Sequence, residues 1–157
     1  MIVCGIDPGK TGAIALIEAI NGKVLIHDIP LNAKGNFIDS LGITDILKNT
    51  DTIWLEQVAS RPHDGRSSLA GFMTIYGGLR ATCLLTGKDT KLILPQVWKK
   101  KLSLIKQPKD ASLDLAKELY PEASHYLKRK KDHNRAEALL IAHYGRLYFE
   151  HQQTIEG

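Results

Sequence analysis

Four acidic residues stand at the ends of predicted structural elements, where they could do metal chemistry together. Asp7 closes an apolar stretch at the N-terminus, Glu56 closes a second one, and Asp132 and Glu137 lie where a long amphipathic segment begins. Ligands collect at strand ends in α/β sheets. Clustered carboxylates repel one another and favour a hard divalent cation such as Mg²⁺. If these acids converge, two ions about 4 Å apart could activate water and stabilise the leaving oxygen of a phosphodiester.

Each acid also has a simpler interpretation, since an isolated acid at a strand end is usually only solvated. The functional interpretation is preferred for Asp7, because a buried strand avoids an unpaired charge, and also for Glu56 and Glu137. Asp132 is equally suited to capping the helix that follows it. His133 is more typical of a surface residue.

Basic residues gather in two segments, although the net charge is only +4, from 21 basic and 17 acidic residues. These clusters fit a phosphate-rich partner, and a solvated helix face is the alternative for either one. Lys109 is favoured as functional, and Lys99 is as well explained by solvation. The residues are Lys99, Lys100, Lys101, Lys106 and Lys109 in the first segment, and Arg129, Lys130 and Lys131 in the second, with Lys128 beside them.

The segment Gly9-Lys10-Thr11 invites comparison with a phosphate-binding loop. That motif requires a glycine at the position of Cys4, and Gly5 is one residue away from it. A tight turn between two strands is therefore the preferred interpretation of the glycines here.

Hydrophobic periodicity predicts strands before and between helices. Asn21-Gly22 indicates a type I′ hairpin turn, Pro95 can open a helix, and residues 58–67 read as a polar loop. The expected strands are 2–7, 13–19, 23–29, 51–57 and 91–94, and the expected helices are 37–47, 68–85, 95–102, 111–120 and 134–150. Three antiparallel strands followed by alternating helices and strands predict an α/β fold, a mixed sheet flanked by helices.

Length and composition predict one globular domain over residues 1–157, with no linker or internal repeat. Cys4 and Cys83 are expected to be core residues, because neither has a cysteine or histidine at ligand spacing. The N-terminus lacks a signal peptide, and no apolar run is long enough to span a membrane. We therefore expect a soluble, cytoplasmic protein with no membrane partner.

Five segments, in this order, resemble RuvC-like Holliday junction resolvases, especially their compact phage-type members. The match covers roughly residues 2–145, and the order of all five is far more specific than any one. The segments are Gly5-Ile6-Asp7-Pro8-Gly9, Leu55-Glu56-Gln57-Val58, Pro95-Gln96-Val97-Trp98-Lys99, Lys109 with Ala111-Ser112, and Arg135-Ala136-Glu137-Ala138-Leu139-Leu140-Ile141-Ala142.

The resemblance implies a ribonuclease-H-like fold, a homodimer, and Mg²⁺- or Mn²⁺-dependent nicking of two opposed strands at a four-way DNA junction, leaving 5′-phosphates. It assigns metal ligation to Asp7, Glu56 and the acids of the last helix, Glu137 and Asp132. Lys99 and Lys109 match lysines near the scissile phosphate. The compact size favours a phage-encoded member acting in the host cytoplasm.

Two positions depart from the family pattern. Asn134 stands where the family often has the first of two acids on the last helix, so the fourth ligand stays open among Asp132, His133 and Asn134. Ala59 stands where many bacterial members have an aromatic wedge, and we expect Arg61, His63 and Arg66 to contact the junction instead.

Three other functions fit parts of the sequence. A nuclease of the same fold could act on RNA or RNA–DNA hybrids, and a non-catalytic protein could bind branched DNA without cutting it. An actin-like ATPase shares the acid-glycine turn, but the chain is too short for its two lobes. Phe72, Met73, Tyr76 and Leu79 recur at helical spacing, which favours a core or dimer contact over a base-stacking platform.

Overall fold

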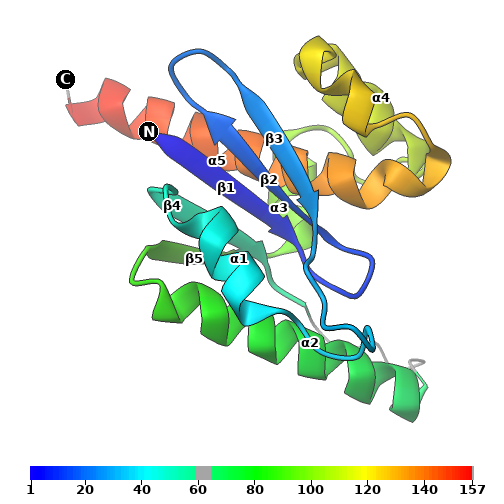
Figure 1. The fold of residues 1–157 in the computed structure, drawn as a ribbon. Helices are drawn as coiled ribbons and strands as arrows, with labels where there is room; N and C mark the ends of the chain where they lie inside the picture. The colour runs from blue at the N-terminus through cyan, green and yellow to red at the C-terminus, as the bar shows by residue number, and fades with distance from the viewer. Residues whose placement is uncertain (59–64, 157) are drawn as a thin grey trace.

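A five-stranded mixed sheet forms the centre of the molecule (Figure 1). The computed structural model describes residues 1–58 and 65–156. The strand order is β3-β2-β1-β4-β5, with β1 antiparallel to β2, β2 antiparallel to β3, and β4 parallel to both β1 and β5. The bounds are Ile2–Asp7 for β1, Ala13–Glu18 for β2, Val24–Asp28 for β3, Thr52–Glu56 for β4 and Asp89–Ile93 for β5. This is the predicted mixed sheet.

Helices cover both faces of the sheet, and each face has its own apolar cluster. On one face α5 runs along β1 and β2, with α3, α4 and two short 3₁₀ helices nearby; α1 and α2 cover the other face (Figure 1). The helices are α1 (Ser40–Leu47), α2 (Arg66–Leu85), α3 (Pro95–Lys101), α4 (Asp110–Leu119), η1 (Pro121–Tyr126), η2 (Lys130–Asp132) and α5 (His133–Glu156). No helix within the described ranges has the length and apolar character needed to cross a membrane.

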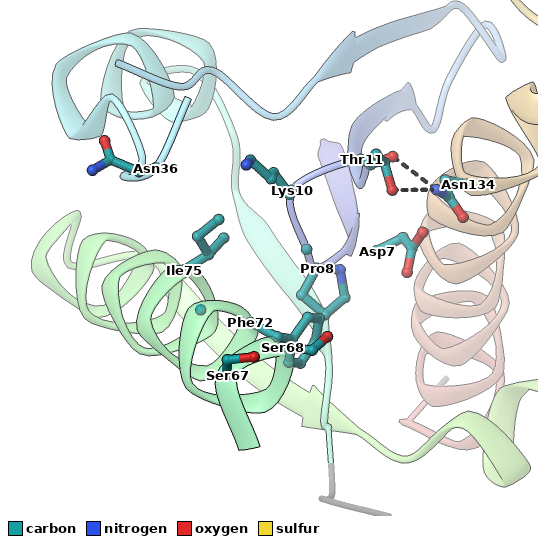
Figure 2. A pocket seen from close by; sticks show the side chains of 12 residues that line it. Asp7, Pro8, Lys10, Thr11, Asn36, Ser67, Ser68, Phe72, Ile75 and Asn134 are labelled. Atoms are coloured by element: carbon teal, nitrogen blue, oxygen red, sulfur yellow. Dashed lines mark hydrogen bonds between the residues drawn. The ribbon is translucent and has the colours of Figure 1, made fainter. Parts of the chain in front are cut away.

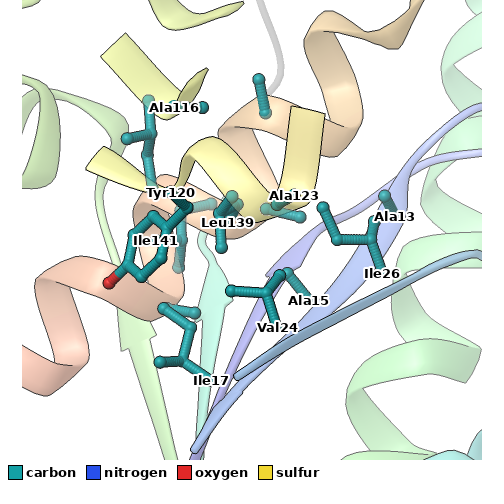
Figure 3. Close-up of a cluster of buried hydrophobic side chains, with 14 of the residues drawn as sticks. Ala13, Ala15, Ile17, Val24, Ile26, Ala116, Tyr120, Ala123, Leu139 and Ile141 are labelled. Carbon is teal, nitrogen blue, oxygen red and sulfur yellow. The ribbon is translucent and has the colours of Figure 1, made fainter. Parts of the chain in front are cut away.

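The alternation of side chains along β1 decides which face receives Asp7. Val3 packs in the α5-side cluster, and Cys4 and Ile6 pack in the cluster beneath α1 and α2. Figure 3 shows part of the α5-side cluster, including Ala13, Ala15 and Ile17 of β2. Because successive strand residues point to opposite faces, Gly5 and Asp7 face α5. The same alternation in β4 puts Trp54 on the α5 side and Leu55 on the other, so Glu56 faces α5 as well.

Two glycines allow α5 to lie in close contact with the sheet. A Cβ atom at Gly5 would collide with the backbone of Ala138 and Ala142, and one at Gly145 would collide with the Trp54 ring. The N-terminal end of α5 therefore lies beside the C-terminal end of β1, where Asp7 is.

The two cysteines are fully buried, as predicted for core residues. Tyr76 and Leu79 are buried in the cluster beneath α2, so the predicted core role is confirmed for both. Met73, in contrast, is 40% exposed.

Several local predictions need correction. Of Asn21 and Gly22 only the glycine has a positive φ, whereas a type I′ turn needs two; the connection instead closes with the Gly22 amide donating to the Glu18 carbonyl. Helix α1 begins at Ser40 rather than at residue 37, because Asp39 caps it by accepting from the Gly42 amide. β5 begins two residues before the predicted 91–94, and the 3₁₀ helices were not predicted.

Candidate active site

Asp7 and Glu56 end neighbouring parallel strands on the face that α5 covers. The register pairs Ile6 with Leu55, so the next residue on each strand brings the two carboxylates side by side. Asp7 is only 8% exposed. Burial raises its pKa well above the usual range, the negative charges of Glu56 and Glu137 raise it further, and Lys99 acts in the opposite direction. Asp7 is thus a buried acid surrounded by two others, an environment that favours a bound cation.

Trp98 in α3 fixes the orientation of Glu56. Its indole Nε1 donates to Glu56 Oε2 at 2.7 Å, and the ring itself is fully buried. Burial raises the pKa of Glu56, while the Trp98 hydrogen bond lowers it, and the charges of Glu137 and Lys99 act in opposite directions. One Glu56 oxygen is therefore held by the protein.

Glu137, in the first turns of α5, completes the group of acids with Lys99 as its counter-ion. Lys99 Nζ lies 3.1 Å from Glu137 Oε1, and the Glu137 side chain is 16% exposed. The ammonium group also lies 5.1 Å from the centre of the Trp98 ring. The three carboxylates and one ammonium that the structure brings together are Asp7, Glu56, Glu137 and Lys99.

The chemistry of these donors fits a hard divalent cation, although the side chains are not preassembled around one. They offer carboxylate oxygens from rigid elements, and Asp7 forms no ion pair with a cationic side chain in the part of the chain that the structure describes. Within residues 1–58 and 65–156, no three Asp, Glu, His or Cys side chains approach closely enough to hold one ion. Binding of a metal ion would therefore require the carboxylate side chains to rotate, while their backbone positions stay as they are.

Asp132, predicted as a metal ligand, is bonded to arginines instead. Its side chain is 3% exposed, and its oxygens accept from the Arg129 guanidinium at 2.7 Å and the Arg129 backbone amide at 2.8 Å. Arg135 lies 3.7 Å away. The hydrogen bonds from Arg129 lower the pKa of Asp132 despite its burial. Both oxygens accept hydrogen bonds from Arg129 at the η2 turn, so metal ligation by Asp132, which stays a prediction, would require these bonds to break.

Of the three residues left open for the fourth ligand, Asn134 is the one that lines the same cavity as Asp7 (Figure 2). Its Nδ2 donates to the Thr11 carbonyl at 2.8 Å and to Thr11 Oγ1 at 3.2 Å. This arrangement leaves Oδ1 as the acceptor on the same side chain. His133 instead places Nδ1 3.2 Å from the Lys130 carbonyl.

Of the predicted basic residues that the structure describes, Lys99 lies beside the acids and the others lie on the surface. Lys109 is exposed at the start of α4 and is not among the charges that shift the pKa values of Asp7 and Glu56. Arg61 and His63 lie outside the described residues, as does the side chain of Arg66. The other predicted DNA contacts are all exposed: Lys100, Lys101, Lys106, Arg129, Lys130 and Lys131.

Two residues of the site were missed by reasoning from sequence alone. Trp98 was assigned only to a helix, although it adjoins Lys99 in the Pro-Gln-Val-Trp-Lys segment that carried the resemblance. Thr11 was placed in a turn, and its contact with Asn134 spans 123 positions, so no local pattern could reveal it.

Comparison with known proteins gives matches of structure only. No family model and no curated protein sequence matches the chain. Among solved structures, Thermus thermophilus RuvC matches with a TM-score of 0.58 and 16% identity over 94% of this chain and 96% of that one. T. thermophilus RuvC in complex with a Holliday junction substrate matches with a TM-score of 0.61 and 15% identity over the same shares. The chain therefore has the ribonuclease-H-like fold of RuvC, as the resemblance of its sequence motifs predicted.

Proposed function

We propose that this protein is a divalent-metal-dependent endonuclease that resolves four-way DNA junctions. The observation that carries the proposal is that Asp7 and Glu56 end neighbouring strands on the sheet face where α5 places Glu137 with its partner Lys99, in a fold shared with RuvC. One of the similar structures holds a Holliday junction substrate, which supports branched DNA as the ligand.

In this proposal Asp7, Glu56 and Glu137 hold Mg²⁺, or Mn²⁺ in its place. When bound, the ions supply an activated water and charge stabilisation at the leaving oxygen. Trp98 keeps one Glu56 oxygen in place through its 2.7 Å hydrogen bond, and Thr11 orients the Asn134 amide. Lys99, which partly neutralises Glu137, is placed to interact with a phosphate oxygen that enters beside the acids.

The exposed basic residues of the two clusters would contact the DNA arms outside the site, which makes binding sensitive to salt. We propose a homodimer, because two sites related by a dyad can cut two symmetric strands. The products expected from this chemistry are a 5′-phosphate and a 3′-hydroxyl.

Cleavage of a labelled four-way junction, with Mg²⁺ and with EDTA, tests the proposal. Wild-type protein should cut opposed strands only with the metal, whereas Asp7→Asn should bind the junction and leave it intact. Asp114→Asn is a matched control, since Asp114 is an exposed acid on α4. A linear duplex and an RNA–DNA hybrid are tested in parallel. Preferred cutting of the hybrid would contradict the proposal, and binding without any metal-dependent cut would identify a non-catalytic protein.

A further inference from the structure

A cavity of about 540 Å³ opens beside Asp7. Its walls come from the β1–β2 turn, from the N-terminal half of α2 and from the segment around Asn36 (Figure 2). Asp7 and Asn134 lie on one side of it, and Asn36 and Ile75 lie on the other. The volume is that of a site for a small ligand, which is roughly 300–1,000 Å³, and is far too small for a DNA duplex.

One wall of this cavity is apolar and rigid. Phe72 and Ile75 lie three residues apart, on one side of α2. The Phe72 ring is parallel to that of Tyr76, with centroids 6.5 Å apart, and one edge of it lies close to Gly9. Gly9 has a φ of +126°, and a Cβ there would come within 3.2 Å of the Phe72 ring. The flat apolar surface is therefore held from two directions.

The opposite wall is polar and carries a positive charge. Lys10 is exposed in the β1–β2 turn and forms no ion pair within the described residues. A second cavity, of about 390 Å³, is also lined by Lys10, Thr11 and Asn134. Lys10 thus lines two neighbouring cavities, of which the larger also includes Asp7. An ammonium group opposite an apolar wall matches the two halves of a nucleotide, its phosphate and its base.

We propose that the 540 Å³ cavity receives one unpaired nucleotide of the cut strand, next to the phosphate that is hydrolysed. Lys10 contacts its phosphate, Phe72 contacts its base or sugar, and Asn36 offers hydrogen bonds at the rim. This inference rests on the proposed function and deepens it. An intact duplex must first unstack a base to fill the cavity, whereas a branch point supplies one at smaller cost. The cavity would thereby select branched DNA.

A side chain built at Gly71 tests the inference by filling the cavity. Gly71 lines the cavity, and a Cβ there would meet no atom within 4 Å. Gly77, on the same helix, has equally open surroundings but does not line it, so Gly77→Leu is the matched control for Gly71→Leu. Junctions carrying 2-aminopurine at single positions around the crossover report unstacking by a rise in fluorescence, measured in EDTA so that bound DNA stays uncut.

We expect a rise at one position beside the cut site for wild type and Gly77→Leu, and none for Gly71→Leu. Gly71→Leu should also bind the junction roughly ten-fold more weakly, with unchanged affinity for linear duplex. Lys10→Gln should lower the slope of log affinity against log salt by about 1, whereas Lys23→Gln, in the exposed β2–β3 connection, should not.

The possible results separate this inference from the proposed function. Wild type that cuts junctions with no position-specific fluorescence rise would overturn the inference alone. A signal that survives Gly71→Leu, or is lost equally in Gly77→Leu, would do the same, as would an unchanged salt slope for Lys10→Gln. Failure to bind or cut any junction would overturn the proposed function and this inference with it.

Discussion

Replacing Asp7 by asparagine should make the metal-free protein more stable while it abolishes cleavage. Burial and the charges of Glu56 and Glu137 raise the pKa of Asp7 above its unfolded value. A carboxyl group of this kind favours folding less as the pH rises through its folded pKa, so its ionised form opposes folding at neutral pH. Asparagine removes that charge at nearly constant volume.

The magnitude follows from the charge repulsion at this buried group. Asp7 is 8% exposed; asparagine keeps a buried polar group there but removes the charge that Glu56 and Glu137 repel, and repulsion by one like charge about 6–12 Å away at an effective dielectric constant of about 20 is about 1–3 kcal/mol. For a chain of this length 1 kcal/mol changes Tm by roughly 2–4 °C, so Asp7→Asn should raise Tm in EDTA by about 2–12 °C. The exposed Asp114→Asn control should stay within about 0.5 kcal/mol of wild type.

Thermal unfolding with and without Mg²⁺ is the assay, combined with junction cleavage. At ten times its dissociation constant, Mg²⁺ should stabilise wild type by about 1.4 kcal/mol, and most of this gain should disappear in Asp7→Asn. Cleavage should fall at least about 100-fold, since metal ions supply several kcal/mol of charge stabilisation. An Asp7→Asn protein that is less stable than wild type in EDTA, or that keeps the full Mg²⁺ effect, would refute the reasoning.

Three further substitutions probe the surroundings of the site. Trp98→Phe removes the hydrogen bond that lowers the pKa of Glu56, so the acidic limb of the pH–kcat/KM profile should move to higher pH; Trp54→Phe, whose indole N–H has no partner among the described residues, should leave the profile unchanged. Asp132→Asn should lower the free energy of unfolding by about 1–3 kcal/mol at neutral pH. Because the pKa of Asp132 is depressed in the folded protein, urea titrations should show this difference disappearing as the pH falls below 3.8, the ordinary pKa of aspartate. The folded variant should still cleave the junction, and a loss of cleavage would indicate that Asp132 is a metal ligand. Gly5→Ala should cost more than about 3 kcal/mol in the same titrations, since its Cβ meets helix backbone, and a cost below 1 kcal/mol would show that α5 can move away freely.

The sheet and its acids could be predicted because they depend on local patterns. The apolar runs within residues 2–7 and 51–57 predicted the two strands, and the alternation of side chains along a strand then gives the face on which each one lies. Asp7 and Glu56 then follow as neighbours once the two strands are parallel and adjacent. The glycine-rich turn after Asp7 was likewise predicted correctly as a tight connection between two strands.

The parts that the sequence left open or placed wrongly depend on contacts that a local pattern does not encode. Asp132 and Glu137 look alike in sequence, yet Asp132 pairs with Arg129 across a single 3₁₀ turn, whereas Glu137 pairs with Lys99. The hairpin at Asn21-Gly22 has a longer connection than its dipeptide suggested, because the Lys23 carbonyl pairs with the Glu18 amide. Ion-pair choice and loop closure are both decided by tertiary geometry.

The absence of a side chain at Gly5 also sets a dimension of the candidate active site. Asp7 follows two residues later on the same face of β1, and Glu137 immediately precedes Ala138, whose backbone the glycine touches. The spacing between Asp7 and Glu137 is therefore set by direct contact between the backbones of β1 and α5 at Gly5. In a genetic screen for lost nuclease activity, substitutions at Gly5 should therefore be recovered as often as substitutions of a metal ligand. Gly5 itself has no side chain that could bind DNA or an ion.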